Sequence, residues 1–277
     1  MPRTIRLAHS PDSDDAFMFY ALAEGKVDTE GLKYVHELQD IETLNQRALR
    51  GELDVTAVSI HAYAYLTQQY ALLPHGASFG DGYGPRLVAR TQMDHADVRG
   101  KRVAVPGPLT TAYLTLKLYE PNFTAVNTRF DEIEDAVVRG DVDLGLLIHE
   151  GQLTYAARGL HLVADMGEWW RRETGLPLPL GGNVVNKALD SATIAAVSRH
   201  LRASIAYSLG HRKPALDYAM QYARGLDRPL ADAFVGMYVN DWTLDYGERG
   251  REAVRSLLRC GVERGIIPHA VTVEFVE

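Results

Sequence analysis

The chain has 277 residues, 46% of them hydrophobic and 23% charged, which is ordinary for a globular protein and enough for two domains. Its formal net charge of -7 argues against nucleic acid or an anionic membrane as a partner, because both bind basic surfaces. No stretch approaches the ~20 apolar residues of a membrane span, and residues 1–10 lack the apolar core of a secretory signal. Cys260 is the only cysteine, so we expect no internal disulfide and no thiol metal cluster in a cytoplasmic protein.

Strand and helix patterns alternate over the first ninety residues. Short apolar or alternating runs predict strands, and runs with helical periodicity predict the helices between them. The expected strands are 5–8, 32–38, 54–59 and 86–90, and the expected helices are 16–23, 41–49 and 61–70. This alternation is typical of an α/β sheet with helices packed on its faces.

A second unit with the same alternation begins after Thr91. Its expected strands are 101–105, 142–148 and 160–165. One expected helix begins at Thr110 and a second covers 131–138, and the chain is mostly helical from 191 to 259. Breakers and polar residues near 90–94 and 179–183 suggest where the chain passes between the units. We therefore expect a two-lobed α/β protein in which residues 1–92 and 183–277, with the C-terminal helices, form lobe one and residues 93–182 form lobe two.

The two units share an internal pattern. In each, a helix ends in Arg-Gly-acid-aliphatic-Asp-aliphatic, at 50–55 and 139–144, and runs into an apolar strand. The glycines would lie past the helix ends, where a left-handed backbone favours glycine. Such a match can also arise by chance, since helix–glycine–strand connections are common. If it reflects shared structure, the strand ends at Ser59 and His149 face one cleft, because ligands gather beyond the carboxyl ends of strands.

Two polar segments lie at expected strand-to-helix turns. Residues 10–15 carry Ser and Asp side chains, Asp14 among them, that can face the cleft. Residues 110–112 begin a helix, where hydroxyl and N–H groups suit an anion. Each segment also has a purely structural interpretation, in which Ser13, Asp14 or a threonine caps the helix.

His149 is the strongest catalytic candidate. It follows an apolar strand at the end where an active site is expected, and imidazole takes up a proton near neutral pH. A lone histidine is more often structural, and only its position improves the case. On a strand, His149 and Glu150 would point to opposite faces, so a shared metal is disfavoured, and the chain has no zinc, calcium, P-loop, dinucleotide or nucleophile-elbow motif.

Four segments together resemble the 1,4-dihydroxy-6-naphthoate synthase family, which works in the futalosine route to menaquinone. They are SPDSDDAFM at 10–18, LIHEGQLTY at 147–155, LPLGGN at 178–183 and YVNDWTLDYG at 238–247. The resemblance runs over nearly the whole chain. Each segment alone is only weakly specific for the family, but the four together are specific.

The resemblance implies a fold like that of type II periplasmic binding proteins, with a cleft between two lobes. It implies a carbon–carbon lyase that converts cyclic dehypoxanthine futalosine, a small anionic substrate, to 1,4-dihydroxy-6-naphthoate without a cofactor. His149 would be the proton acceptor. With Asp14 from the loop 10–15, the expected substrate-binding residues are Ala57, Val58, Ser59, Thr110, Thr111, Ala112 and Asp14.

Two other functions are compatible with this fold. A chorismate dehydratase of the same pathway would have a similar two-lobed shape, and fold alone does not decide function. A non-catalytic binding protein for a small anionic solute is the other alternative, and it would bind its ligand without turnover. The sequence does not determine the oligomeric state.

Overall fold

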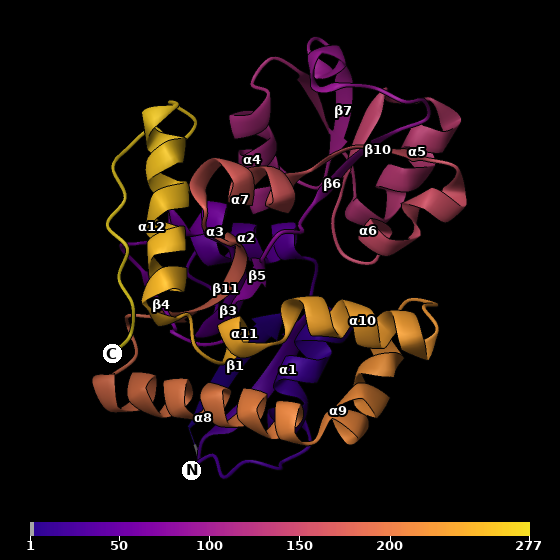
Figure 1. Cartoon of the computed structure of the whole chain (residues 1–277). Helices are drawn as coiled ribbons and strands as arrows, with labels where there is room; N and C mark the ends of the chain where they lie inside the picture. The colour runs from indigo at the N-terminus through magenta and orange to yellow at the C-terminus, as the bar shows by residue number, and fades with distance from the viewer. Residues whose placement is uncertain (1–2) are drawn as a thin grey trace.

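The computed structural model describes residues 3–277 and contains two β-sheets, each with helices on its faces (Figure 1). The first sheet has the strand order β2-β1-β3-β11-β4, with β5 also paired to β11, and the second has the order β10-β6-β9-β7-β8. We refer to the part built on the first sheet as lobe one and to the part built on the second as lobe two. The two-lobed α/β architecture predicted from the sequence is confirmed.

Lobe one is organised around parallel strands. β1 pairs in parallel with β2 and β3, so the carboxyl ends of these strands lie at one edge of the sheet. β11 runs antiparallel to β3, β4 and β5. The strands of this sheet are β1 (Thr4–His9), β2 (Lys33–Leu38), β3 (Val55–Ser59), β4 (Tyr70–Leu72), β5 (Ser78–Gly80) and β11 (Leu178–Asn186).

Lobe two follows the same plan. β7 pairs in parallel with β8 and β9, while β6 runs antiparallel to β9 and β10. Its strands are β6 (Arg86–Ala89), β7 (Arg102–Val105), β8 (Thr124–Asn127), β9 (Leu144–Leu147) and β10 (His161–Asp165).

The helices cover both sheets. Those before Ser191 are α1 (Ser13–Ala23), α2 (Ile41–Leu49), α3 (Ile60–Tyr63), α4 (Thr111–Tyr119), α5 (Ile133–Arg139), α6 (Gly151–Thr154) and α7 (Met166–Thr174). The C-terminal helices are α8 (Ser191–Gly210), α9 (Arg212–Ala219), α10 (Arg228–Tyr238), α11 (Asp241–Leu244) and α12 (Gly247–Glu263). Four 3-10 segments are also present within residues 3–277: η1 (His95–Val98), η2 (Phe130–Glu132), η3 (Tyr155–Arg158) and η4 (Met220–Tyr222).

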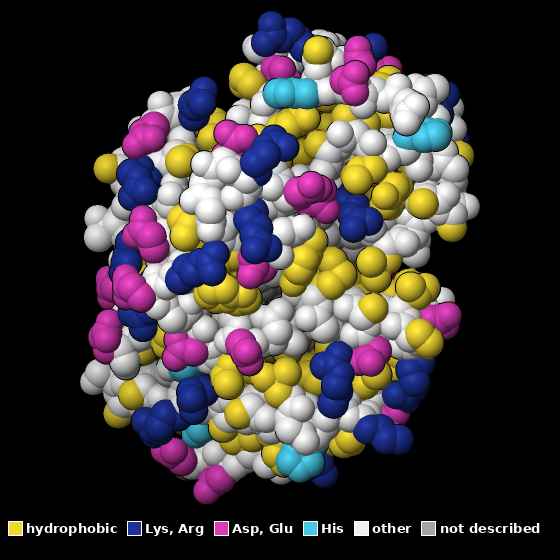
Figure 2. All heavy atoms as spheres, viewed as in Figure 1, with side chains coloured by type: hydrophobic (Ala, Val, Ile, Leu, Met, Phe, Trp, Pro, Cys, Tyr) yellow, Lys and Arg dark blue, Asp and Glu magenta, His cyan; other side chains and the backbone are white. Residues whose placement is uncertain are grey.

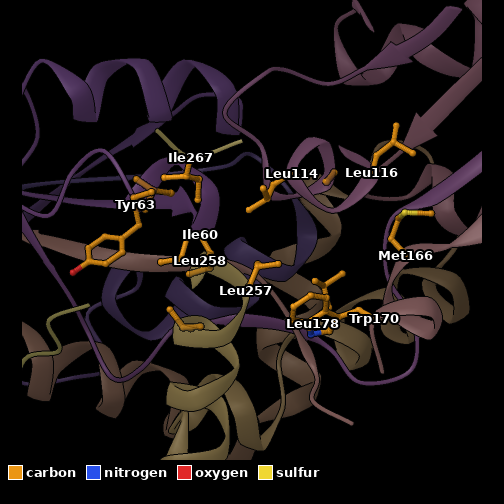
Figure 3. Close-up of a cluster of buried hydrophobic side chains, with 14 of the residues drawn as sticks. Ile60, Tyr63, Leu114, Leu116, Met166, Trp170, Leu178, Leu257, Leu258 and Ile267 are labelled. Atoms are coloured by element: carbon orange, nitrogen blue, oxygen red, sulfur yellow. The ribbon is translucent and has the colours of Figure 1, made fainter. Parts of the chain in front are cut away.

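The C-terminal helices pack back on lobe one, as predicted. α8, α9 and α10 contact α1, and α12 lies along β11 (Figure 1). A single hydrophobic cluster joins the lobes: side chains of α3, α4, α7 and α12 meet in it, among them Tyr63, Leu114, Trp170 and Leu257 (Figure 3). None of the helices within residues 3–277 has the length and apolar character needed to cross a bilayer.

The internal pattern in the two units reflects equivalent structure. α2 leads into β3 and α5 leads into β9. β3 pairs in parallel with β1, and β9 pairs in parallel with β7, so the two strands have the same place in their sheets. Gly51 and Gly140 adopt φ values of 68° and 80°, the left-handed conformation expected past a helix end. The carboxyl ends of β3 and β9 are therefore equivalent positions in the two lobes.

The chain passes between the sheets earlier than the expected boundaries after residues 92 and 182. β6 belongs to the second sheet, so the first crossing lies between Gly80 and Arg86. The return lies between Asp165, at the end of β10, and Leu178, because β11 already pairs with the first sheet. The glycines expected to break the chain at 181–182 lie inside β11, where antiparallel pairing with β3 satisfies their backbone.

The helix predicted over 61–70 is wrong. α3 ends at Tyr63 after a single turn, and Tyr70 begins β4. β4 extends the first sheet by pairing with β11, and all three of its residues are buried. Residues that pair 112 or more positions apart make a tertiary contact, and the periodicity of a short stretch of sequence cannot reveal it.

Candidate active site

A cavity lies between the lobes, beyond the ends of β3, β7 and β9. It encloses about 750 Å³ of empty space, part of which is open to solvent. Every residue expected at the site lines it: Asp14, Ala57, Val58, Ser59, Thr110, Thr111, Ala112 and His149. On the face in Figure 2, Lys and Arg side chains are interspersed with Asp and Glu, so that face has no broad basic surface.

Asn45 determines which way the Ser59 hydroxyl can act. The Ser59 backbone N–H donates to Asn45 Oδ1 at 2.9 Å, and this contact fixes the orientation of the amide because the N–H can only donate. Asn45 Nδ2 must then donate to Ser59 Oγ, at 3.1 Å. Since Oγ accepts from Asn45, its own proton is available to a ligand oxygen. Ser59, at the carboxyl end of β3, is therefore prepared as a donor.

The start of α4 forms the lobe-two side of the cavity. Thr110 is the N-cap: its Oγ1 accepts from the Tyr113 N–H at 3.2 Å and donates to Gly107 O at 2.8 Å. The capping interpretation is thus confirmed for this threonine. The N–H groups of Thr111 and Ala112 belong to the first turn, where no intrahelical acceptor exists, so they are suited to an anionic group.

The hydroxyl of Thr111 ties the lobes together. It donates to Leu180 O at 2.6 Å and accepts from the His61 N–H at 3.2 Å, so its proton is used inside the protein. Leu180 lies on β11 and His61 on α3, both in lobe one. The proton of the Thr111 hydroxyl is consequently not available to a ligand in the cavity.

His149 lies two residues past the end of β9 and pairs with a carboxylate from the other lobe. Its Nδ1 is 3.0 Å from Asp12 Oδ2, and its ring packs edge-on against Phe130 with centroids 4.8 Å apart. Burial by itself would lower the pKa of His149, but the Asp12 carboxylate outweighs it and raises the pKa to about 9. Because ionised Asp12 accepts from Nδ1, the other ring nitrogen, Nε2, is the one left for a ligand.

Asp12 stays ionised although it is buried. Burial would raise the pKa of its carboxyl, but the neighbouring His149 and Arg224 hold that pKa below its usual value. His149 comes from lobe two and Arg224 from the loop before α10, so this carboxylate is held by two distant parts of the chain. Asp12 was not singled out as a site residue from the sequence, although it lies within the motif at 10–18.

Asp14 is the second carboxyl at this end of the cavity. The expected capping of α1 by Ser13 or Asp14 is wrong, because Asp12 is the N-cap and its side chain makes no capping hydrogen bond. Asp14 Oδ1 is buried and has no hydrogen-bond partner within residues 3–277. Burial and the adjacent Asp12 carboxylate raise the pKa of Asp14 to about 7. At neutral pH this side chain is therefore poised between acceptor and donor.

Two further lining residues close the cavity between the lobes. The Tyr238 hydroxyl on α10 donates to Gln152 Oε1 on α6 at 2.7 Å. Both residues lie in segments that carry the sequence resemblance, at 147–155 and 238–247, but neither was expected to act at the site. Within residues 3–277, no group of three His, Cys, Asp or Glu side chains is arranged to hold a metal ion.

Comparison with known proteins identifies the family. Residues 5–263 match a family described as menaquinone biosynthesis. This protein belongs to that family. Two relatives named 1,4-dihydroxy-6-naphthoate synthase match over nearly their whole length: the Thermus thermophilus protein is 42% identical over 95% of both chains, and the Streptomyces coelicolor protein is 40% identical over 96% of this chain and 95% of its own.

Solved structures support the fold assignment. A crystal structure of a protein from Archaeoglobus fulgidus superposes with a TM-score of 0.92 at 48% identity, covering 95% of this chain and 98% of that one. The alkanesulfonate-binding protein of Xanthomonas axonopodis superposes with a TM-score of 0.71 at 13% identity, covering 98% and 96%. At that low identity the likeness concerns the fold alone. This chain thus has the two-lobed fold of periplasmic binding proteins.

Proposed function

We propose that this protein is a 1,4-dihydroxy-6-naphthoate synthase, a carbon–carbon lyase acting in the cytoplasm on the small anionic molecule cyclic dehypoxanthine futalosine. The observation that carries the proposal is the meeting of the His149–Asp12 pair with Ser59 and the start of α4 around one cavity. The close relatives named for this activity support it. Neither a cofactor nor a metal ion is required in this proposal.

Substrate binding would use donors from both lobes. Thr111 and Ala112 line the cavity at the N-terminus of α4, where free N–H groups would favour a carboxylate. Ser59 offers its hydroxyl proton from the opposite side because Asn45 occupies the lone pair. Ala57 and Val58 lie next to Ser59 on β3 and line the cavity, where the substrate would pass over this part of the strand.

His149 would remove a proton from a substrate hydroxyl through Nε2. Loss of that proton drives a cleavage of the retro-aldol type, and formation of the aromatic ring makes the cleavage favourable. A positioned base of this kind contributes roughly 10²–10⁴-fold to the rate. With the pKa of His149 at about 9, the imidazole is mostly protonated at pH 7, so the proposal requires kcat to rise with pH towards 9.

The buried acidic groups around the base fit such chemistry. The positive charge that His149 acquires is balanced by Asp12, and the neutral form of Asp14, present below a pH of about 7, can donate a hydrogen bond when the substrate or product binds. The two lobes already contact each other through Thr111 to Leu180 and Tyr238 to Gln152, and closer approach of the lobes over the substrate would exclude water from the intermediate.

A direct assay separates the candidate functions. The purified protein is incubated with cyclic dehypoxanthine futalosine and, separately, with chorismate, and the formation of naphthoate is followed by absorbance. We expect naphthoate from the first substrate and no change in the second. Turnover of chorismate alone would identify a dehydratase, and binding without turnover of either would identify a solute-binding protein.

A further inference from the structure

Arg224 joins three separate parts of the chain behind the cavity. It lies between η4 and α10, and its Nη2 is 2.5 Å from Asp12 Oδ1, an ion pair whose geometry is not that of an aligned hydrogen bond. The same nitrogen donates to Pro11 O at 3.2 Å. Arg224 therefore holds the loop at the start of α1 on the side opposite His149.

The same guanidinium also reaches lobe two. It lies over the Phe130 ring with 4.5 Å between the Cζ atom and the ring centroid, and its Nη1 is 3.7 Å from Glu150 Oε2. Phe130 in turn packs against the His149 ring. Arg224 and Phe130 thus enclose the Asp12–His149 pair from two sides, and a planar guanidinium can make the ion pair and the stacking contact together.

Strained backbone conformations occur at both partners of Asp12, His149 and Arg224. Among residues 3–277, the non-glycine residues with positive φ are Glu30, His149 and Arg224, with φ values of 49°, 55° and 48°. Two of these three residues are the partners of Asp12. Unfavourable backbone conformations of this kind persist where the surrounding structure imposes them, and they cluster at sites that must hold a geometry.

We propose that Arg224 is a positioning residue of the lyase reaction, which holds Asp12 Oδ1 so that Oδ2 faces the Nδ1 atom of His149 and which ties this pair to lobe two through Phe130. Arg224 does not line the cavity, so it acts through Asp12 and not on the substrate. The inference deepens the proposed function and rests on it for its consequence on turnover, while the arrangement of the pair can be measured without any substrate.

The experiment compares Arg224→Met, Arg224→Lys and the control Arg228→Met. Arg228 lies four residues further on, at the start of α10, and pairs with Asp217. The first measurement is the far-downfield proton signal of the imidazole Nδ1–H hydrogen-bonded to Asp12, assigned by its loss in His149→Asn. We expect this signal in the wild type and in Arg228→Met, and a weakened or upfield-shifted signal in Arg224→Met.

The second measurement is steady-state kinetics with the substrate proposed above. Because a misplaced base slows the chemical step more than it weakens binding, we expect kcat of Arg224→Met to fall about 10-fold to 100-fold with KM changed less than about threefold. Arg224→Lys keeps the charge but lacks the planar group that stacks on Phe130, so it should restore kcat only in part. Thermal unfolding checks that each variant is folded. If Arg224→Met does not fold, the comparison is made with Arg224→Lys alone.

The outcomes separate this inference from the proposed function. An Nδ1–H signal and a kcat in both Arg224 variants equal to those of the wild type would overturn the inference. Loss of the signal without any lyase activity in the wild type would support the positioning role and reject the proposed reaction. Equal losses in Arg224→Met and Arg228→Met would show a general effect on this loop and would also overturn the inference.

Discussion

The two ends of the cavity are both strand-to-helix turns, yet their polar groups are treated in opposite ways. At the start of α4, the hydroxyls of Thr110 and Thr111 are fully engaged with protein atoms. At the start of α1, the side chain of Asp12 makes no capping bond, and buried oxygens of Ser13 and Asp14 have no hydrogen-bond partner in the described part of the chain, residues 3–277. The hydroxyls at the α4 end therefore all have protein partners, whereas buried oxygens at the α1 end are left without one in that part of the chain.

This difference suggests separate roles in substrate binding and in proton transfer. At the start of α4 the side-chain hydroxyls already have hydrogen-bond partners and the N–H groups are fixed in position, so this end suits binding of a carboxylate. Buried carboxyl groups close together cannot all be ionised, so protons or a ligand must relieve them. Perturbed pKa values of this kind cluster where proton transfer takes place. The chemistry is therefore expected at the α1 end, beside His149.

The largest effect is expected from His149→Asn, which removes the proposed base while keeping a polar side chain of similar reach. We expect kcat to fall by about 10²–10⁴-fold, the usual contribution of a positioned base. Product formation is measured at saturating substrate. The control is His161→Asn, an exposed histidine on β10. Turnover of His149→Asn at the wild-type rate would reject the assignment of the base.

Asp12→Asn tests whether the carboxylate sets the basicity of His149. In the wild type the pKa of His149 is raised to about 9, and kcat should rise with pH until the imidazole is neutral. Without the Asp12 charge that pKa falls, so kcat should level off at lower pH. We expect a maximum about 10-fold to 100-fold below that of the wild type, because the ring is also less well oriented. A pH profile of kcat measures both changes.

The matched control for this profile is Asp141→Asn, which removes a carboxylate on the protein surface. Its kcat should follow the wild-type profile over the whole pH range. If kcat of Asp12→Asn levels off at the same pH as kcat of the wild type, Asp12 does not set the pKa of His149.

Asp14→Asn tests the role of the neutral carboxyl at the α1 end. Since the pKa of Asp14 is raised to about 7, its ionisation between pH 6 and 8 should weaken binding of the anionic product 1,4-dihydroxy-6-naphthoate by about tenfold in the wild type. His149 stays protonated in this window and does not contribute. The Asn variant should bind the product with little dependence on pH, as measured by competitive inhibition. A wild-type affinity that is constant over this range would contradict the assignment.

The smallest effect is expected from Asn45→Asp, which changes the partner of Ser59 at the end of β3. The carboxylate still accepts from the Ser59 N–H, but it now accepts from the Ser59 hydroxyl as well, so that proton is withdrawn from the ligand. Loss of one such hydrogen bond should raise KM by about threefold to tenfold with a smaller effect on kcat. Asn122→Asp, at an exposed position, is the control. An unchanged KM would show that Ser59 does not donate to the substrate.

Local sequence alone was enough for much of the architecture. Periodicity identified α2, β2, β7 and β10 to within a residue or two, and the shared pattern at 50–55 and 139–144 identified the equivalent strands of the two lobes. It also placed His149 and Ser59 at strand ends, which the cavity brings together. These features follow from short-range spacing, since helix and strand periods, glycine turns and strand ends are properties of neighbouring residues.

Only the tertiary structure decided which groups act on one another. Asp12 meets His149 across 137 positions of sequence, Arg224 reaches both lobes from a C-terminal loop, and Asn45 fixes the Ser59 hydroxyl from a neighbouring helix. The crossings between the sheets and the strand at 178–186 likewise depend on pairing with distant strands. The physical reason is that pKa values, donor direction and strand pairing depend on the distance to groups far away along the chain, and the spacing of neighbouring residues carries no record of that distance.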